Sequence, residues 1–210
     1  MSKTIRSMLA ALSLAFPVQG AWAGDGFYIG LAAALARADL PDEFSTSAAS
    51  YDLQRDVDDT GEGLKIYVGH DVSRHAAVEF CYSDFGKFTI YDRLSSTGVN
   101  AVESAEYKGY SFDLSALGIA RLCERFSLYG RAGASFWNLE FRHQMTGSLP
   151  NFKQTRKEFG ISPLFGVGAG FRFHDKGTLR VEYQRYLDIG NDDIGHTDID
   201  VISVGGQYHF

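Results

Sequence analysis

Apolar residues alternate with small or polar ones from Phe27 onward. Phe27 and Ile29 fall on one side of this period, and Tyr28 and Gly30 fall on the other. Successive side chains of a β-strand point to opposite faces, so a period of two predicts strands rather than helices. The pattern predicts eight strands, over residues 27–36, 62–72, 76–85, 107–119, 126–141, 160–173, 178–186 and 198–210.

The connections between these strands alternate in length. The short ones are Ser73 to His75, Arg121 to Arg125 and His174 to Gly177. The long ones are 37–61, 86–106, 142–158 and 187–197, and they are polar. Tight turns at one end and long loops at the other are typical of an antiparallel up-and-down transmembrane β-barrel with periplasmic turns and extracellular loops. A soluble barrel has no physical reason to keep every long loop at one end.

The two faces of the predicted strands differ in polarity. In 178–186 one row holds Leu179 and Val181, whereas the other holds Arg180, Glu182 and Gln184. Rows of the second kind suit a narrow lumen packed with polar side chains, so we expect the apolar rows to face lipid. Aromatic residues near the strand ends are candidates for the two interfacial girdles: Phe27, Tyr82, Tyr110, Phe126, Phe136, Phe173 and Tyr208.

The N-terminal segment resembles a secretory signal peptide. Lys3 and Arg6 precede an apolar run over residues 8–18, which is too short to span a bilayer, and the small residues of Ala21-Trp22-Ala23 follow. We therefore expect a signal peptide over residues 1–23, cleavage between Ala23 and Gly24, and a single barrel domain over 24–210 with no room for a second domain.

The composition excludes several other classes of protein. An aromatic content of 14% is too high for a disordered chain, and a net charge of −6 argues against a nucleic-acid partner. The two cysteines, Cys81 and Cys123, cannot supply a four-ligand zinc site. Cys123 lies in a predicted turn and Cys81 several residues up its strand, a separation that favours free thiols over a disulfide.

The chain ends on an aromatic residue. Phe210 continues an alternating row with Tyr208, Val204 and Ile202, which we expect to face lipid. A terminal aromatic in this setting resembles the signal by which the outer-membrane assembly machinery recognises its clients.

Three stretches, with the GFYIGLAAA opening at residue 26, resemble the eight-stranded transmembrane domain of the OmpA family. They are GHDVSRHAAVEFCYSDFGK (69–87), ISPLFGVGAGFRFHDKGTLRVEYQRY (161–186) and VISVGGQYHF (201–210). The resemblance covers essentially the whole chain after the signal peptide. Longer members append a peptidoglycan-binding domain, and we do not expect one here because the sequence stops at the last predicted strand.

The resemblance also implies an ion pair across the lumen, between Glu79 and Arg180. The family's second inward pair, of a lysine with a glutamate, has no counterpart in 113–118 and 166–171. The period of two places further charged residues on the inward rows: Lys65, Asp113, Arg131, Arg172 and Glu182. We expect these groups to satisfy one another in a network, because an unpaired charge in a low dielectric is costly.

Candidates for other chemistry are weaker. The glycines of 166–170 lack the following helix that a phosphate-binding loop needs. His143 with Ser148, and His196 beside the aspartates, do not form a serine–histidine pair on any strand, so we predict no catalytic residue, cofactor or metal site. Two loop clusters stay open as alternatives, a divalent-cation site and a contact for anionic headgroups. They are Asp192, Asp193, Asp198 and Asp200, and Lys153, Arg156 and Lys157.

We therefore predict a monomeric outer-membrane barrel with a structural or surface-interaction role. Its expected partners are outer-membrane lipids and lipopolysaccharide, the assembly machinery, and extracellular ligands bound through the long loops. The alternatives are a small pore for ions or solutes and, less favoured, an enzyme that modifies lipid A.

Overall fold

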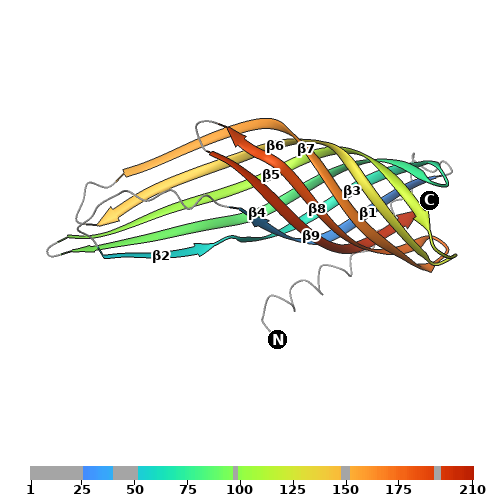
Figure 1. Cartoon of the computed structure of the whole chain (residues 1–210), viewed down its shortest axis with the longest axis horizontal. Helices are drawn as coiled ribbons and strands as arrows, with labels where there is room; N and C mark the ends of the chain where they lie inside the picture. Colours follow the sequence, from blue (N-terminus) through green and yellow to red (C-terminus); the bar gives the residue numbers. More distant parts are fainter. Residues whose placement is uncertain (1–25, 40–51, 97–98, 148–151, 192–194) are drawn as a thin grey trace.

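The computed structural model describes residues 26–39, 52–96, 99–147, 152–191 and 195–210 (Figure 1). In these ranges the chain forms nine strands, and no helix of a length and apolarity that would cross a membrane. The strands are β1 (Phe27–Ala38), β2 (Asp52–Asp58), β3 (Thr60–Ser73), β4 (Ala76–Ser96), β5 (Val99–Arg121), β6 (Phe126–Gly147), β7 (Phe152–His174), β8 (Gly177–Asn191) and β9 (Gly195–His209).

Antiparallel pairing closes the sheet into a barrel. β1 pairs with β3 on one side and with β9 on the other, through Ala32↔Lys65 and Ala32↔Gly205. The ring then runs through β4, β5, β6, β7 and β8 back to β9. Eight strands, β1 and β3 to β9, make the ring, which confirms the predicted fold class.

The ninth strand, β2, extends β3 beyond a bulge. Only Asp59 separates β2 from β3, and both pair with β4, through Asp58↔Thr89 and Lys65↔Ser83. At the junction Gly86 has a φ of +75°, and a Cβ on Gly63 would lie 1.8 Å from the backbone O of Asp84. Glycines therefore let the two strands cross closely at this bulge.

Two of the predicted long loops are largely strand. Residues 86–106 and 142–158 were expected as polar loops, but β4 pairs with β5 out to Ser96↔Val99, and β6 with β7 out to Met145↔Phe152. The expectation was wrong because the strands of an antiparallel hairpin can pair while their outer face stays polar and meets water. We call the part that rises beyond the ends of β1, β8 and β9 the extracellular wall; it consists of β2 and residues 87–96, 99–108, 138–147 and 152–160 (Figure 1).

The exterior of the ring is apolar. Phe80, Phe112, Phe136 and Phe165 are each about half exposed on outward rows. On β4 the inward residues Glu79, Cys81 and Ser83 alternate with the outward ones and are buried. The predicted girdle residues Tyr110, Phe126, Phe136, Phe173 and Tyr208 are exposed on the same side. The inside-out arrangement of the prediction is thus present along the ring.

Candidate functional site

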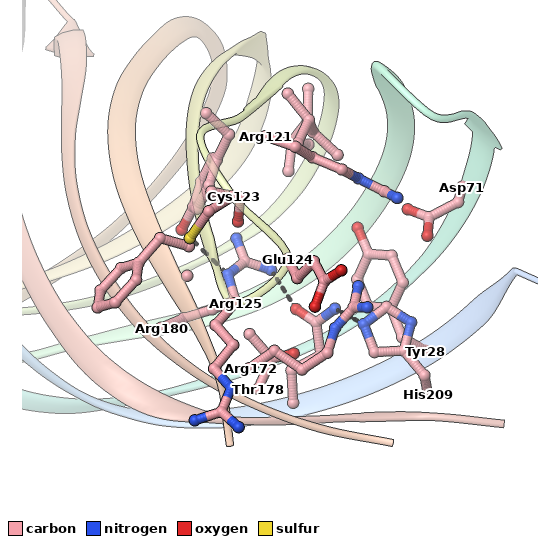
Figure 2. A pocket seen from close by; sticks show the side chains of 17 residues that line it. Tyr28, Asp71, Arg121, Cys123, Glu124, Arg125, Arg172, Thr178, Arg180 and His209 are labelled. Atoms are coloured by element: carbon pink, nitrogen blue, oxygen red, sulfur yellow. Dashed lines mark hydrogen bonds between the residues drawn. The ribbon is translucent and has the colours of Figure 1, made fainter. Parts of the chain in front are cut away.

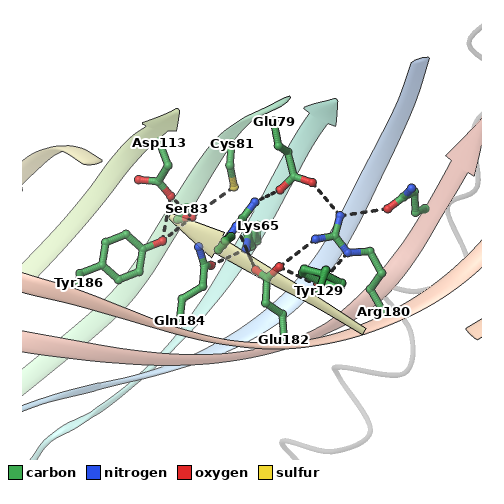
Figure 3. A network of polar contacts seen from close by, with 12 residues as sticks. Lys65, Glu79, Cys81, Ser83, Asp113, Tyr129, Arg180, Glu182, Gln184 and Tyr186 are labelled. Carbon is green, nitrogen blue, oxygen red and sulfur yellow. Dashed lines mark hydrogen bonds and ion pairs between the residues drawn. The ribbon is translucent and has the colours of Figure 1, made fainter. Parts of the chain in front are cut away.

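Charged side chains from four strands meet in the middle of the lumen (Figure 3). Glu79 accepts a hydrogen bond from Nη1 of Arg180 at 2.7 Å and also pairs with Arg131. Glu182 accepts from Nη1 of Arg131 at 3.0 Å and from Nη2 of Arg180 at 2.8 Å, and it pairs with Lys65. Both carboxylates therefore bridge the same two guanidinium groups, which links β4, β6 and β8 across the barrel.

Tyrosines complete this network. The hydroxyl of Tyr129 donates to Glu182 at 2.7 Å, and that of Tyr28 donates to Glu79 at 3.1 Å. The guanidinium of Arg180 lies 4.5 Å from the ring centre of Tyr67 and 4.6 Å from that of Tyr129. Such cation–π contacts stabilise a desolvated arginine and hold it in one orientation.

Asp113 lies in a neighbouring cluster of hydroxyl groups. Its carboxylate accepts from Ser111 at 2.8 Å, from Tyr186 at 2.8 Å and from Ser83 at 3.1 Å. The lumen thus holds three cations and three anions, which sum to zero: Lys65, Arg131, Arg180, Glu79, Glu182 and Asp113. Asp113 therefore balances the third cation of the lumen.

Arg172 does not join this network, contrary to the expectation. It is exposed at the end of β7, where the β7–β8 register shifts between Arg172 and His174. There it lines a cavity of about 80 Å³ at the periplasmic mouth, together with Arg121, Arg125 and, from the lumen, Arg180 (Figure 2). Arg172 still lies on the inward row of β7, but it lies at the periplasmic end of the strand and does not pair with the buried carboxylates.

The extracellular end of the lumen is apolar. A cluster of buried side chains from seven strands fills it, including Phe85, Phe88, Ile90, Tyr107, Trp137, Leu139, Leu164, Tyr186, Ile189, Ile199 and Val201. The indole N–H of Trp137 donates to the hydroxyl of Ser162 at 2.8 Å, so its one polar group is satisfied. The prediction of a polar lumen is therefore correct only for the lower and middle parts.

The alternation along the sequence does not predict this apolar cluster, for a local reason. The bulge at Gly86 changes which residues of β4 point inward, from Phe85 before it to Phe88 and Ile90 after it. A second register shift, between Tyr186 and Ile189, does the same on β8. The glycine that follows Phe85 is the one sequence signal that could have indicated the first bulge.

The acidic loop cluster is described only in part, because Asp192 and Asp193 lie outside the described residues. Arg185 pairs with Asp198 at 2.8 Å and with Asp200 at 3.2 Å. The backbone N–H of Asp188 and the Arg185 guanidinium lower the pKa of Asp198. Both described aspartates thus bind an arginine, and the described part of the chain contains no group of three or more histidine, cysteine or acidic residues that could hold a metal ion.

A band of charges crosses the outer face of the extracellular wall. Lys87, Lys108, Glu140 and Lys157 are lateral neighbours on β4 to β7, and Glu106 pairs with Arg142 one row above. We define these six residues as the charged band. Its ion pairs include Lys87–Glu106 at 2.6 Å, Arg142–Glu140 at 2.7 Å and Lys157–Glu140 at 3.3 Å, and hydrogen bonds from Arg142 and Lys157 lower the pKa of Glu140.

Other predicted residues occupy separate places. Ile202, Val204 and Tyr208 are exposed on the outward row of β9, and the backbone N–H of Phe210 donates to the carbonyl of Phe27 at 3.1 Å. The thiol of Cys81 is buried, that of Cys123 is exposed, and both are free. Ala23, Gly24 and Ser148 lie outside the described residues. His143 stacks on Phe141 with ring centres 6.0 Å apart.

Known proteins were compared by sequence and by fold. A family model described as OmpA-like transmembrane domain matches residues 22–210. Outer membrane protein A of Yersinia pseudotuberculosis is 23% identical over 150 residues, which cover 70% of this chain and 40% of that protein. The chain therefore spans less than half of that relative's length.

Solved structures share the fold at low identity. Ail of Yersinia pestis superposes with a TM-score of 0.54 at 18% identity, covering 89% of this chain and 100% of that one. Neisserial surface protein A gives 0.56 at 17% identity, covering 89% and 98%. OprG of Pseudomonas aeruginosa gives 0.53 at 12% identity, covering 89% and 96%.

The closed ring with an apolar exterior and a paired polar lumen defines the class of eight-stranded outer-membrane β-barrels. Within that class, the chain belongs to the OmpA-like transmembrane domain family. Its location is the outer membrane.

Proposed function

We propose that the protein acts through its extracellular wall, with the barrel as a closed anchor in the outer membrane. The observation that carries the proposal is the apolar cluster around Trp137, which fills the lumen at the level where the wall begins. Beneath it, the six lumen charges neutralise one another. An ion that entered from the periplasm would lose its hydration before it reached the extracellular side.

Planar-bilayer recording tests this proposal against a pore. We expect no discrete channel events from the unmodified protein, because the apolar cluster excludes water. The double variant Trp137→Ala and Phe88→Ala removes two large side chains from the cluster, and we expect it to conduct. Discrete openings of the unmodified protein that change in Glu79→Ala or Arg180→Ala would replace the proposal with a low-conductance pore.

The charged band supports a contact with phosphates of lipopolysaccharide. It carries four cations, Lys87, Lys108, Arg142 and Lys157, against two anions. The exposed aromatic rings of Tyr110 and Phe159 lie on the adjacent outward row, so the band sits at the level of the headgroups. Basic groups at this level attract anionic headgroups.

Vesicles test the phosphate contact. We expect the melting temperature of the barrel to be higher in vesicles with intact lipid A than with dephosphorylated lipid A. The variant Lys87→Gln with Lys108→Gln should lose this difference. Arg37→Gln, on β1, should keep it because Arg37 lies outside the charged band. An equal melting temperature in both vesicles would remove lipopolysaccharide phosphate as a partner.

The relatives suggest a surface role without defining its ligand. Ail was solved in complex with the heparin analogue sucrose octasulfate, a property of that protein. For this chain we propose an extracellular ligand bound on the wall by a monomer without enzymatic activity. If the protein has no enzymatic activity on lipid A, the mass spectra of lipid A should be the same in cells with and without the protein.

The proposal includes export with removal of residues 1–23 and insertion by the outer-membrane assembly machinery. N-terminal sequencing of the protein from outer membranes should begin at Gly24. A protein that still carries residues 1–23 would contradict this part of the proposal.

A further inference from the structure

Among the described residues of the extracellular wall, β2 and the upper part of β7 each pair with a strand on one side only. The β7 edge is the basic one. β7 pairs with β6 from Phe152 to Phe171, but with β8 only from Leu164 onward. Among the described residues, 152–163 thus have a strand on one side only. Figure 1 shows this part of β7 extending past the arrowhead of β8. We call the extracellular part of this segment, residues 152–158, the free edge.

The separation of β8 from β7 is built into the chain. Asp188 has a φ of +57°, and the register of β8 shifts there, so that Ile189 pairs with Thr197 of β9. The hydroxyl of Ser162 donates to the carbonyl of Asp188 at 2.9 Å, and the N–H of Asp188 donates to Asp198 at 2.9 Å. These bonds hold the turning point in place and direct β8 toward β9.

The exposed fractions of the outward side chains are independent evidence that no strand pairs with this side of β7. Phe112, Phe136 and Ile161 occupy one outward row on β5, β6 and β7, and their exposed fractions rise from 42% through 48% to 68%. Phe159, nearest the free edge, is 82% exposed. The increase toward β7 is expected where no strand covers the far side.

The free edge is basic. Lys153 and Lys157 point to the outer face, Arg156 points to the inner face, and all three are exposed against a single acid, Glu158. Opposite charges on directly facing residues of paired strands stabilise the pairing, and like charges destabilise it. Identical edges of two copies in one membrane would run parallel and set like charges side by side. The edge is therefore unsuited to pairing with the same edge of a second copy and suited to an acidic strand.

We propose that the free edge binds an acidic, extended segment of another protein by strand addition. Main-chain hydrogen bonds to residues 152–158 supply the affinity, and Lys153 and Arg156 select acidic residues on the two faces of the incoming strand. Seven residues match the usual length of a strand. This proposal deepens the proposed surface function and rests on it.

A short synthetic peptide of alternating glutamate and valine tests the proposal. Fluorescence anisotropy would measure its binding to the full chain extracted in folded form from outer membranes. We expect saturable binding and slower amide hydrogen exchange in 152–158. Lys153→Glu with Arg156→Glu should weaken binding by about tenfold. Lys108→Glu is the matched control, because Lys108 is exposed on β5 between two paired strands, and it should bind normally.

A second peptide separates strand addition from simple charge attraction. The same sequence with N-methyl groups on alternate residues keeps its charge but loses the N–H donors, and we expect it not to bind. Equal binding of the two peptides, or equal weakening in Lys108→Glu, would overturn the proposal. So would binding of sucrose octasulfate that depends on Lys153 and Arg156 without binding of the peptide. The planar-bilayer test of the closed lumen does not depend on peptide binding, so the two proposals can fail separately.

Discussion

At the scale of residues, the lumen is held by buried ion pairs that share their partners. Glu79 is completely buried and bridges Arg131 and Arg180. Without Glu79 both arginines would depend on Glu182, and the lumen would carry one uncompensated positive charge. An uncompensated buried charge costs far more than the net stabilisation of the intact group.

Glu79→Ala is therefore expected to lower the free energy of unfolding by roughly 3–5 kcal/mol. Tyr28→Phe removes only the hydroxyl that donates to Glu79 and should cost about 1 kcal/mol. Urea unfolding in lipid vesicles, followed by tryptophan fluorescence, measures both. A loss below that of Tyr28→Phe would mean that water reaches the two arginines.

Asp198 gives a pH dependence with a defined sign. Its pKa is lower in the folded protein than in the unfolded chain, so its stabilisation is complete above the unfolded pKa and is lost as the pH falls through the folded pKa. We expect the β8–β9 end to open more readily below about pH 4, whereas Asp198→Asn should show a smaller change. Hydrogen exchange of β8 and β9 amides at several pH values measures this. The same pH profile in both proteins would exclude Asp198 as the cause.

At the scale of elements, bulges decide where strands turn and which side chains enter the lumen. The strand positions 62–72, 76–85 and 126–141 could be predicted because the lipid face imposes strict alternation there. The wall and the apolar cluster could not be predicted. Above the membrane, apolar and polar residues no longer alternate clearly, and the bulges at Gly86 and Asp188 exchange the inward and outward positions of the strand.

Gly63→Ala tests the close approach of β3 to β4 at the bulge. The added Cβ would lie 1.8 Å from the carbonyl O of Asp84, so the strands must move apart. We expect a loss of roughly 1–3 kcal/mol in stability and faster hydrogen exchange in β2. Gly118→Ala has no atom within 4 Å of its Cβ and serves as the control. Equal stability of the two variants would show that the close crossing is not required.

At the scale of the whole molecule, closure joins the first strand to the last. The N–H of Phe210 donates to the carbonyl of Phe27, so the C-terminal residue lies at the seam between β1 and β9. The position of this aromatic residue at the seam supports the proposal that Phe210 is part of the signal for the assembly machinery.

Phe210→Ala is expected to reduce the amount of folded barrel in the outer membrane several-fold, while refolding of the purified chain into vesicles stays normal. Heat-modifiable migration on gels measures folded protein in both settings, because a folded barrel resists SDS until it is boiled. Phe173→Ala, at another exposed aromatic position, is the control. An equal loss of refolding in vesicles would assign Phe210 to stability rather than to recognition.

The sequence by itself determined the class of this protein, because lipid on the outside requires an apolar residue at every second position and such a pattern is readable along the chain. It also placed Glu79 and Arg180 inward. Only the tertiary structure decided that an apolar cluster fills the extracellular end of the lumen, that Arg172 lies outside the network, and that β7 has a free edge. Each of these depends on register and strand ends, which arise from contacts between segments distant in the chain.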